Sequence, residues 1–368
     1  MADFQTSTQR AKWIFTPQKL AERYKAANQR AVQMLEKCGT TQVEVDASGS
    51  LTYPKDKVGP GDQADKKLKP LSVDEERFMR AFYEAKVQEV CSAFAFPHKI
   101  QATALQYFKR FYLQWSVMQH HPKEIMLTCV YAACKIEENH VSAEEIGKGI
   151  NQDHRIILKY EMAVLQSLEF DLIVYAPYRA IEGFVNNMEE FLQARDDEIQ
   201  KLESLLKGAT AEADKVMLTD APLLFPPGQL ALASLRIANG VLGVIDFDRY
   251  LENIVSQRNS EHTSSELTKL LDNIEYLVKN YKCPSEKDMK HINRKLKSCL
   301  GHSSSHDEYT NNLSSTNSFN HYIYFISFAS AIDSLLYLSS SGVRNGRRDQ
   351  NTSPIGAPMI HQTGHRHP

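Results

Sequence analysis

Residues 122–135 read PKEIMLTCVYAACK, and this stretch decides the fold. Pro122 suits the first turn of a helix, where its missing N–H would have had no partner. The residues after it leave almost no polar face, so the helix must be surrounded by other helices. The stretch therefore predicts a hydrophobic central helix within an all-α domain.

A second helix of the same kind begins at Pro227. Aligning Pro227 with Pro122 places apolar residues of 229–238 on apolar residues of the first helix. Both helices are unusually apolar and both start with proline, so the pattern indicates an internal duplication of a helical domain. The joint falls near Ala176 and Pro177, because the residue before a proline disfavours helix.

The rest of the chain is arranged around these two helices. Thr16 and Pro17 form a helix start signal, and Ser285 with Asp288 forms another. We predict six segments: residues 1–40, an N-terminal amphipathic helix; 41–71, a loop or linker; 72–176, the first copy of the helical domain; 177–282, the second copy; 283–300, a C-terminal helix; and 301–368, a low-complexity tail of unknown role.

One charge stands among apolar residues. A helix is expected over residues 154–168, and Glu161 falls on its apolar stripe, four residues after Ile157. A carboxylate in that place needs a cation or hydrogen-bond donors, and Lys135, at the end of the central helix, is the natural candidate. Two interpretations remain open: an internal pair of Lys135 with Glu161, or two charges at the rim of an apolar face that docks another protein.

The composition excludes several classes of protein. With 43 Lys+Arg, 45 Asp+Glu and a net charge of -2, the chain lacks the basic excess of a dedicated nucleic-acid binder. Its six cysteines form no Cys-x-x-Cys pair and no signal peptide precedes them, so we expect reduced thiols in an intracellular protein. The apolar run 321–338 contains Asp333, and this charge argues against a membrane span.

The common enzyme motifs are missing from the sequence. There is no dinucleotide-binding glycine fingerprint, no phosphate-binding loop, no nucleophile elbow and no His-Glu-x-x-His. We therefore expect no cofactor, no metal site and no catalytic residues.

Several runs of sequence resemble the cyclin box. They are residues 107–113 (YFKRFYL), residues 133–138 (ACKIEE), Tyr160-Glu161 and, in the second copy, Pro177-Tyr178-Arg179. The chain is similar to the cyclin family over about residues 10 to 300, and it most resembles the cyclin H branch of that family. The two copies would then be the first and second cyclin boxes, and nothing after Leu300 matches.

The resemblance implies a non-catalytic regulatory subunit of the CDK-activating kinase. Such a subunit binds a cyclin-dependent kinase catalytic subunit, a RING-finger assembly factor and the core of transcription factor IIH in the nucleus, without touching nucleic acid or membrane directly. It supports phosphorylation of cell-cycle kinases and of the RNA polymerase II C-terminal domain. The family's kinase-contacting positions fall on Lys135, Glu161, Glu138, Ile136, Leu165, Phe170 and Leu172.

Two other functions stay possible at this point. One is a transcription cyclin that acts with a different kinase. The other is a cyclin-fold transcription factor of the IIB type, which would need an N-terminal zinc ribbon and a basic DNA-binding face. The sequence has neither feature.

Overall fold

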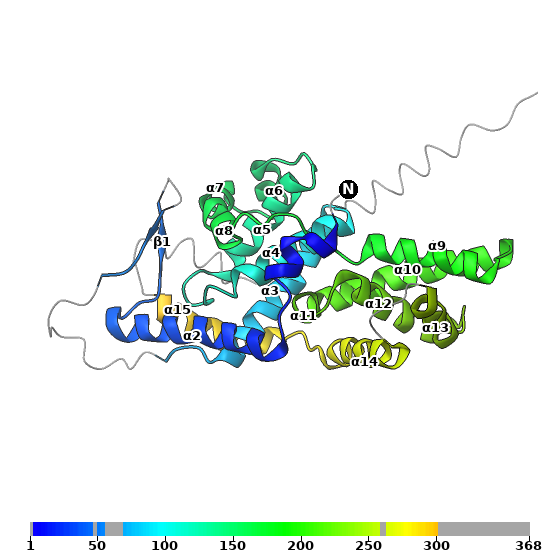
Figure 1. The fold of residues 1–368 in the computed structure, drawn as a ribbon. Coiled ribbons are helices and arrows are strands. Elements are labelled where there is room, and N and C mark those ends of the chain that lie inside the picture. The colour runs from blue at the N-terminus through cyan, green and yellow to red at the C-terminus, as the bar shows by residue number, and fades with distance from the viewer. Residues whose placement is uncertain (1–2, 47–49, 56–68, 258–262, 301–368) are drawn as a thin grey trace, which may run out of the picture. The chain divides into compact units, whose positions relative to one another are not determined.

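The computed structural model describes residues 3–46, 50–55, 69–257 and 263–300. Within these residues the chain is helical except for one two-stranded hairpin (Figure 1), so the predicted all-α fold is confirmed. None of the described helices is long and apolar enough to cross a bilayer. The predicted tail 301–368, with its apolar run 321–338, lies outside the described residues.

The first copy contains a ring of helices around the stretch that decides the fold. Its helices are α3 (Val73–Ala93), α4 (His98–Phe111), α5 (Pro122–Ile136), α6 (Ala143–Gly149), α7 (His154–Lys159) and α8 (Glu161–Ser167). Pro122 occupies the first turn of α5, and the Nδ1 atom of His121 accepts a hydrogen bond from the Lys123 N–H at 3.2 Å. Helix α5 contacts α3, α4, α7 and α8, so it is the central helix that its composition predicted.

The second copy repeats this plan. Its helices are α9 (Tyr178–Leu192), α10 (Asp196–Leu218), α11 (Ala221–Leu224), α12 (Pro227–Leu242), α13 (Phe247–Gln257) and α14 (Ser264–Asn280). Pro227 again stands in the first turn, and α12 contacts α9, α10, α11 and α14. Each copy therefore places one proline-initiated apolar helix at its centre.

The remaining elements flank the first copy. They are η1 (Phe4–Thr6), α1 (Thr8–Lys12), α2 (Pro17–Cys38), β1 (Glu44–Val45), β2 (Leu51–Thr52) and α15 (Glu286–Leu300). Both α2 and α15 pack on α3. The ends of α2 and α15 meet, because the Thr41 N–H donates to the Cys299 carbonyl at 3.1 Å and the Thr40 hydroxyl donates to the Leu300 carbonyl at 3.1 Å.

Two expected segments differ from the structure near the N-terminus. The amphipathic helix expected within residues 1–40 runs only from Pro17 to Cys38, because Thr16 caps it, and the short helices η1 and α1 precede it. The segment 41–71 is not only a loop, since β1 and β2 pair in antiparallel register. Residues 56–68 of that segment lie outside the described residues.

The prediction of a single helix over residues 154–168 is wrong, since the segment forms two helices, α7 and α8. Tyr160 ends α7 and precedes α8, with φ −95° and ψ 0°. Its side chain is buried beside His120, with ring centroids 5.9 Å apart, so packing redirects the chain at this residue. Ile157 and Glu161 therefore do not share one helix face.

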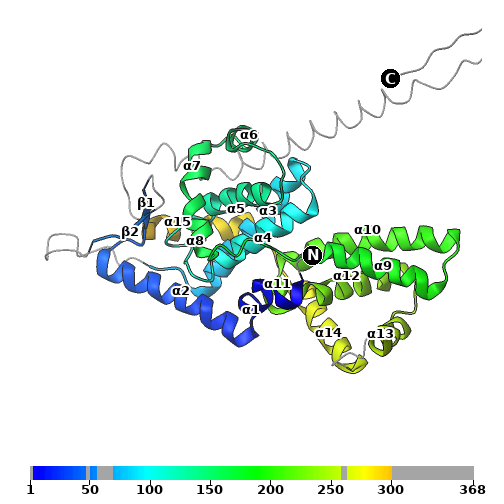
Figure 2. The same cartoon turned by 45° about the horizontal axis from the view of Figure 1, so that its top comes forward.

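Helix α4 contacts α10 of the second copy (Figure 2). Several of its buried side chains are polar. The Lys109 ammonium lies 2.7 Å from a Glu84 carboxylate oxygen and donates to the Leu218 carbonyl of the second copy at 3.2 Å. The Gln106 amide donates to the Pro222 carbonyl at 3.1 Å. Buried polar groups need such partners, so these bonds fix how α3 and α4 meet the second copy.

We predict that α15 depends on its buried stripe. Leu296 is buried against the core, so Leu296→Ala should lower the free energy of unfolding by about 2 to 4 kcal/mol. Arg294→Ala on the same helix changes an exposed side chain and should stay within about 0.5 kcal/mol of the native protein. Urea denaturation of the two variants provides the measurement, and equal losses would contradict the packing of α15.

A second prediction concerns His120. Burial lowers its pKa from 6.5 to about 4, and neither ring nitrogen has a hydrogen-bond partner among the described residues. Below pH 6.5 the unfolded chain binds a proton that the folded chain does not accept until about pH 4, so stability is full above pH 6.5 and is lost as the pH falls toward 4. His120→Phe should therefore remove about 1 to 2 kcal/mol of the stability loss between about pH 7 and pH 5.

Urea denaturation at both pH values tests this expectation. The pKa of His121 is also lowered by burial, to about 3, so some pH dependence should persist in the His120→Phe variant. An unchanged difference between the two pH values would show that His120 does not bind the proton responsible.

Candidate functional site

Lys135 and Glu161 form an ion pair at the surface. Lys135 stands in the last turn of α5 and Glu161 is the first residue of α8, and Lys135 Nζ lies 2.6 Å from Glu161 Oε1. The side chains are 50% and 21% exposed. The hydrogen bond to Glu161 raises the pKa of Lys135. The internal pair considered from the sequence is therefore present, but water reaches both groups.

The backbone at the end of α5 positions the next two predicted residues. Glu138 adopts a left-handed conformation with φ 58°, and its N–H donates to the Lys135 carbonyl at 3.3 Å. A non-glycine residue pays about 1 to 2 kcal/mol for this conformation. The turn ends the helix and leaves the side chains of Ile136 and Glu138 exposed beside Lys135.

A tight turn after α8 holds the remaining predicted residues. Glu169 and Phe170 are both left-handed, with φ 51° and 57°, and the Phe170 N–H donates to the Leu165 carbonyl at 3.0 Å. The Leu172 N–H donates to the Phe170 carbonyl, also at 3.0 Å. Leu165, Phe170 and Leu172 therefore follow one another closely, while Leu172 is partly buried against the core.

Exposed apolar side chains gather on the elements that carry the ion pair. Ile136 ends α5, Leu158 lies on α7, Met162 on α8, and Phe170 and Ile173 on the segment after α8. We call these five residues the exposed apolar face. Phe170 is 58% exposed and Ile173 is 61% exposed, which is unusual for large apolar side chains that have no partner to cover them.

Sequence reasoning missed three residues of this face. Leu158, Met162 and Ile173 were not among the predicted site residues. Leu158 and Met162 lie on either side of the break at Tyr160, and both are exposed. The apolar stripe predicted through Ile157 did not include them.

The N-terminal segment braces the chain between the two copies. The Gln9 amide donates to the Tyr175 carbonyl at 3.1 Å and accepts from the Tyr175 N–H at 2.8 Å. Gln9 is buried, so these two bonds satisfy groups that water does not reach. The Phe4 ring packs edge-on against the Tyr175 ring, with centroids 5.6 Å apart.

The brace continues at Trp13 and Asp171. The Trp13 indole N–H donates to Asp171 Oδ2 at 3.2 Å, and the Trp13 ring covers the Arg110 guanidinium at 5.0 Å. Arg110 is fully buried and donates to the Asp171 carbonyl at 3.3 Å. Burial lowers the pKa of Arg110 to about 10. The segment that carries Phe170 and Leu172 is thus held from both sides.

The described residues contain no group of three or more His, Cys, Asp or Glu side chains that could hold a metal ion. What the surface offers chemically is one exposed ion pair next to exposed apolar side chains, which are the components of a protein-binding surface.

Two known protein families match nearly the whole duplicated region. The family described as Cyclin, N-terminal domain matches residues 63–173, and the family described as Cyclin C-terminal domain matches residues 176–279. The chain therefore belongs to the cyclin family.

Within this family the chain is similar to cyclin H proteins, as its sequence indicated. It is 99% identical over 308 residues to Cyclin-H1-1 of Arabidopsis thaliana, which covers 84% of this chain and 92% of that protein. It is 34% identical over 238 residues to Cyclin-H of Xenopus laevis, which covers 62% of this chain and 72% of that protein.

Two solved structures share the fold. A chain of the CAK complex from Chaetomium thermophilum bound to ATP-gamma-S superposes with a TM-score of 0.67 and 20% identity, over 85% of this chain and 95% of that chain. A chain of the yeast TFIIK (Kin28/Ccl1/Tfb3) complex gives a TM-score of 0.57 and 24% identity, over 75% of this chain and 100% of that chain.

We predict that Gln9 keeps the segment after α8 in place. Gln9→Leu removes two hydrogen bonds and leaves the Tyr175 N–H and carbonyl without these partners, so the Tyr175 amide should exchange hydrogen at least about tenfold faster. Gln18→Leu changes an exposed glutamine on α2 and should leave this exchange unchanged. Hydrogen exchange followed by mass spectrometry measures both, and equal protection in the two variants would contradict the brace.

Proposed function

We propose that the chain is a cyclin H-like regulatory subunit that binds and activates a cyclin-dependent kinase within a CDK-activating kinase complex. The similarity to cyclin H proteins supports this function. The observation that carries it at the level of residues is the half-exposed pair of Lys135 with Glu161 beside the exposed apolar face.

The kinase would be bound by seven residues that the sequence singled out. They are Lys135, Glu161, Glu138, Ile136, Leu165, Phe170 and Leu172. Because the pair is partly solvated, Lys135 and Glu161 can each turn to an opposite charge on the kinase without first leaving a buried partner. Covering Phe170 and its apolar neighbours supplies the main favourable free energy, since burial is worth about 25 cal/mol per Å² of apolar area.

Activation would follow from population shift. A kinase in equilibrium between inactive and active conformations moves toward the one that the cyclin binds better. A rigid binding surface favours one arrangement of the kinase's mobile helix, and the bonds of Gln9, Tyr107 and Arg110 to the segment after α8 provide that rigidity. The cyclin itself would contribute no catalytic residue.

Further partners follow from the same proposal. The complex would include a RING-finger assembly factor and associate with the core of transcription factor IIH in the nucleus. Its substrates would be cell-cycle kinases and the RNA polymerase II C-terminal domain. The CAK and TFIIK complexes, each of which contains a chain with this fold, motivate these assignments.

Removing the ion pair should weaken kinase activation without unfolding the chain. Exposed pairs contribute only about 0 to 1 kcal/mol to stability, so Lys135→Ala combined with Glu161→Ala should fold normally. Losing both contacts to the kinase should reduce its affinity for the cyclin at least about tenfold. Titration of kinase activity toward a peptide substrate with increasing cyclin measures the change.

Matched controls exist in the second copy. Lys215 and Glu212 form a pair on α10 with an N–O distance of 2.7 Å, and their side chains are 60% and 18% exposed. Both values are close to those of Lys135 with Glu161. Replacing both with alanine should leave activation unchanged. Phe170→Ala should weaken it and Tyr276→Ala, another exposed aromatic, should not. Full activation by the Lys135/Glu161 variant would refute the assigned site.

A separate experiment tests the partner: the purified chain is used to capture the kinase, which is then identified.

A further inference from the structure

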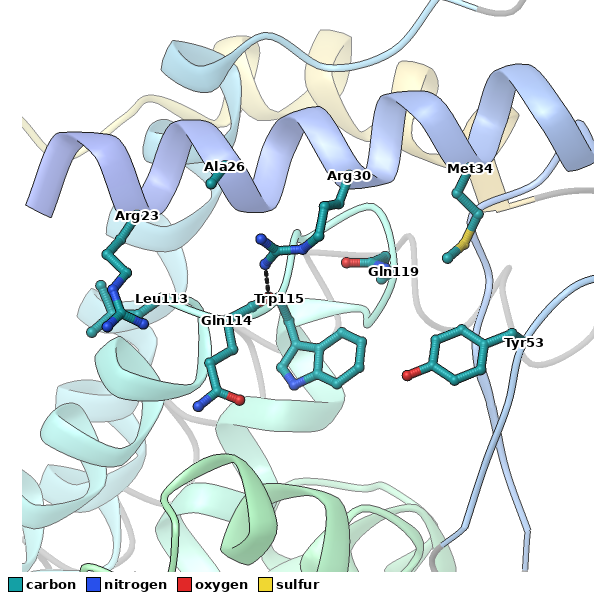
Figure 3. A pocket seen from close by; sticks show the side chains of 9 residues that line it. All are labelled: Arg23, Ala26, Arg30, Met34, Tyr53, Leu113, Gln114, Trp115 and Gln119. Atoms are coloured by element: carbon teal, nitrogen blue, oxygen red, sulfur yellow. Dashed lines mark hydrogen bonds between the residues drawn. The ribbon is translucent and has the colours of Figure 1, made fainter.

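A groove lies along α2 on the first copy, and the kinase contacts proposed above do not use it. Its volume is about 360 Å³ (Figure 3). Helix α2 forms one wall, the turn between α4 and α5 forms the other, and Tyr53 follows strand β2 at one end. The residues that line it, which we call the α2 groove, are Arg23, Ala26, Arg30, Met34, Tyr53, Leu113, Gln114, Trp115 and Gln119.

The charged side chains that line the α2 groove are all positive. Arg23 and Arg30 line it, and none of the nine lining residues carries a carboxylate. Neither arginine forms an ion pair with any residue in the described part of the chain, whereas Lys109, Lys135 and Lys295 each meet a carboxylate. The exposed Lys19 and Lys37 extend the same face of α2 at helical spacing.

Structure around the groove holds these groups in place. Arg30 Nη2 donates to the Gln114 carbonyl at 2.6 Å, which turns its guanidinium over the groove (Figure 3). The Trp115 indole N–H donates to the Ser167 hydroxyl at 2.9 Å, and its ring packs edge-on against His120 with centroids 4.8 Å apart. The groove therefore offers a held guanidinium at Arg30 above a fixed aromatic wall, and less has to be ordered on binding.

We propose that the α2 groove binds an acidic segment of a protein partner that places an apolar or aromatic side chain between its carboxylates. Arg23 and Arg30 are two helical turns apart, about 10 Å along the axis, so they suit two carboxylates at that separation. Ala26 lies between the arginines on α2 and Trp115 lines the groove below them (Figure 3), and these two residues suit an apolar side chain.

A protein segment fits these features better than a nucleic acid does. The lining residues other than Arg23 and Arg30 are uncharged, whereas a phosphate backbone would need further positive charge along the groove. Arginine and tryptophan beside each other are typical of the residues that dominate protein interfaces. The proposal goes beyond kinase activation and concerns a separate binding event of the chain alone.

The test uses the full chain and a fluorescein-labelled synthetic peptide of about twelve residues, composed of glutamate with a central Leu-Phe pair. Fluorescence anisotropy should show binding that weakens as salt is added, because exposed charges are screened. Arg23→Glu combined with Arg30→Glu should weaken binding at least about tenfold. Lys25→Glu combined with Arg294→Glu changes the net charge equally at exposed positions outside the groove and should bind as the native chain does.

A steric variant separates a groove from a simple basic patch. Ala26→Trp keeps both arginines and fills the space between them, so it should weaken binding about as much as the charge reversal. Thermal melting confirms that each variant is folded.

Four outcomes would overturn the proposal. They are absence of peptide binding to the native chain, equal binding of a peptide of glutamate alone, equal binding of single-stranded DNA of the same charge, and equal loss in the control variant. Kinase activation is measured in a separate assay, so failure of the peptide to bind is distinguishable from failure of the proposed function.

Discussion

The structure depends on the hydrogen bonds that buried polar side chains of helix α4 donate to the elements around it. Lys109 reaches a carboxylate of α3 and a carbonyl of the second copy, and Gln106 reaches another carbonyl there. Their sequence neighbours Tyr107 and Arg110 donate to the Leu172 and Asp171 carbonyls between the copies. Each donor is buried and costly to leave unpaired, so both copies and the segment that joins them must adopt one arrangement.

Burial separates two lysine–glutamate pairs that look alike in sequence. The pair of Lys109 with Glu84 is 1% and 6% exposed, and removing one partner there would leave an uncompensated charge in the interior. The pair of Lys135 with Glu161 has a similar N–O distance but is 50% and 21% exposed, so either group can exchange its partner at a smaller cost. The first pair therefore maintains the fold, while the second suits the binding role proposed for it.

Periodicity and start signals predicted the helices whose formation is mainly local. The caps at Thr16 and the prolines at positions 122 and 227 act within one turn, so α2, α5 and α12 begin where the sequence indicates. The break at Tyr160 has another origin, since it follows from the packing of a buried ring against His120. No pattern within residues 154–168 reports that contact.

The candidate site was also predictable only in part, because some of its contacts join residues far apart in the sequence. The sequence pointed to Lys135 and Glu161 because a carboxylate among apolar residues needs a partner, and the contact exists although the assumed continuous helix does not. The brace at Gln9 could not be predicted, because its bonds to Tyr175 span 166 residues and Gln9 has no distinctive neighbours in the sequence. The α2 groove likewise requires the turn after α4 to lie beside α2.

The left-handed turn at Glu169 and Phe170 restricts which side chains can occupy position 170. A β-branched residue such as isoleucine or valine would match the hydrophobicity of Phe170 but clash with its own backbone at φ 57°. Glycine or asparagine would suit the backbone and remove the apolar surface. Backbone geometry and the proposed kinase binding thus make opposite demands on Phe170. A large apolar side chain without a branch at Cβ meets both.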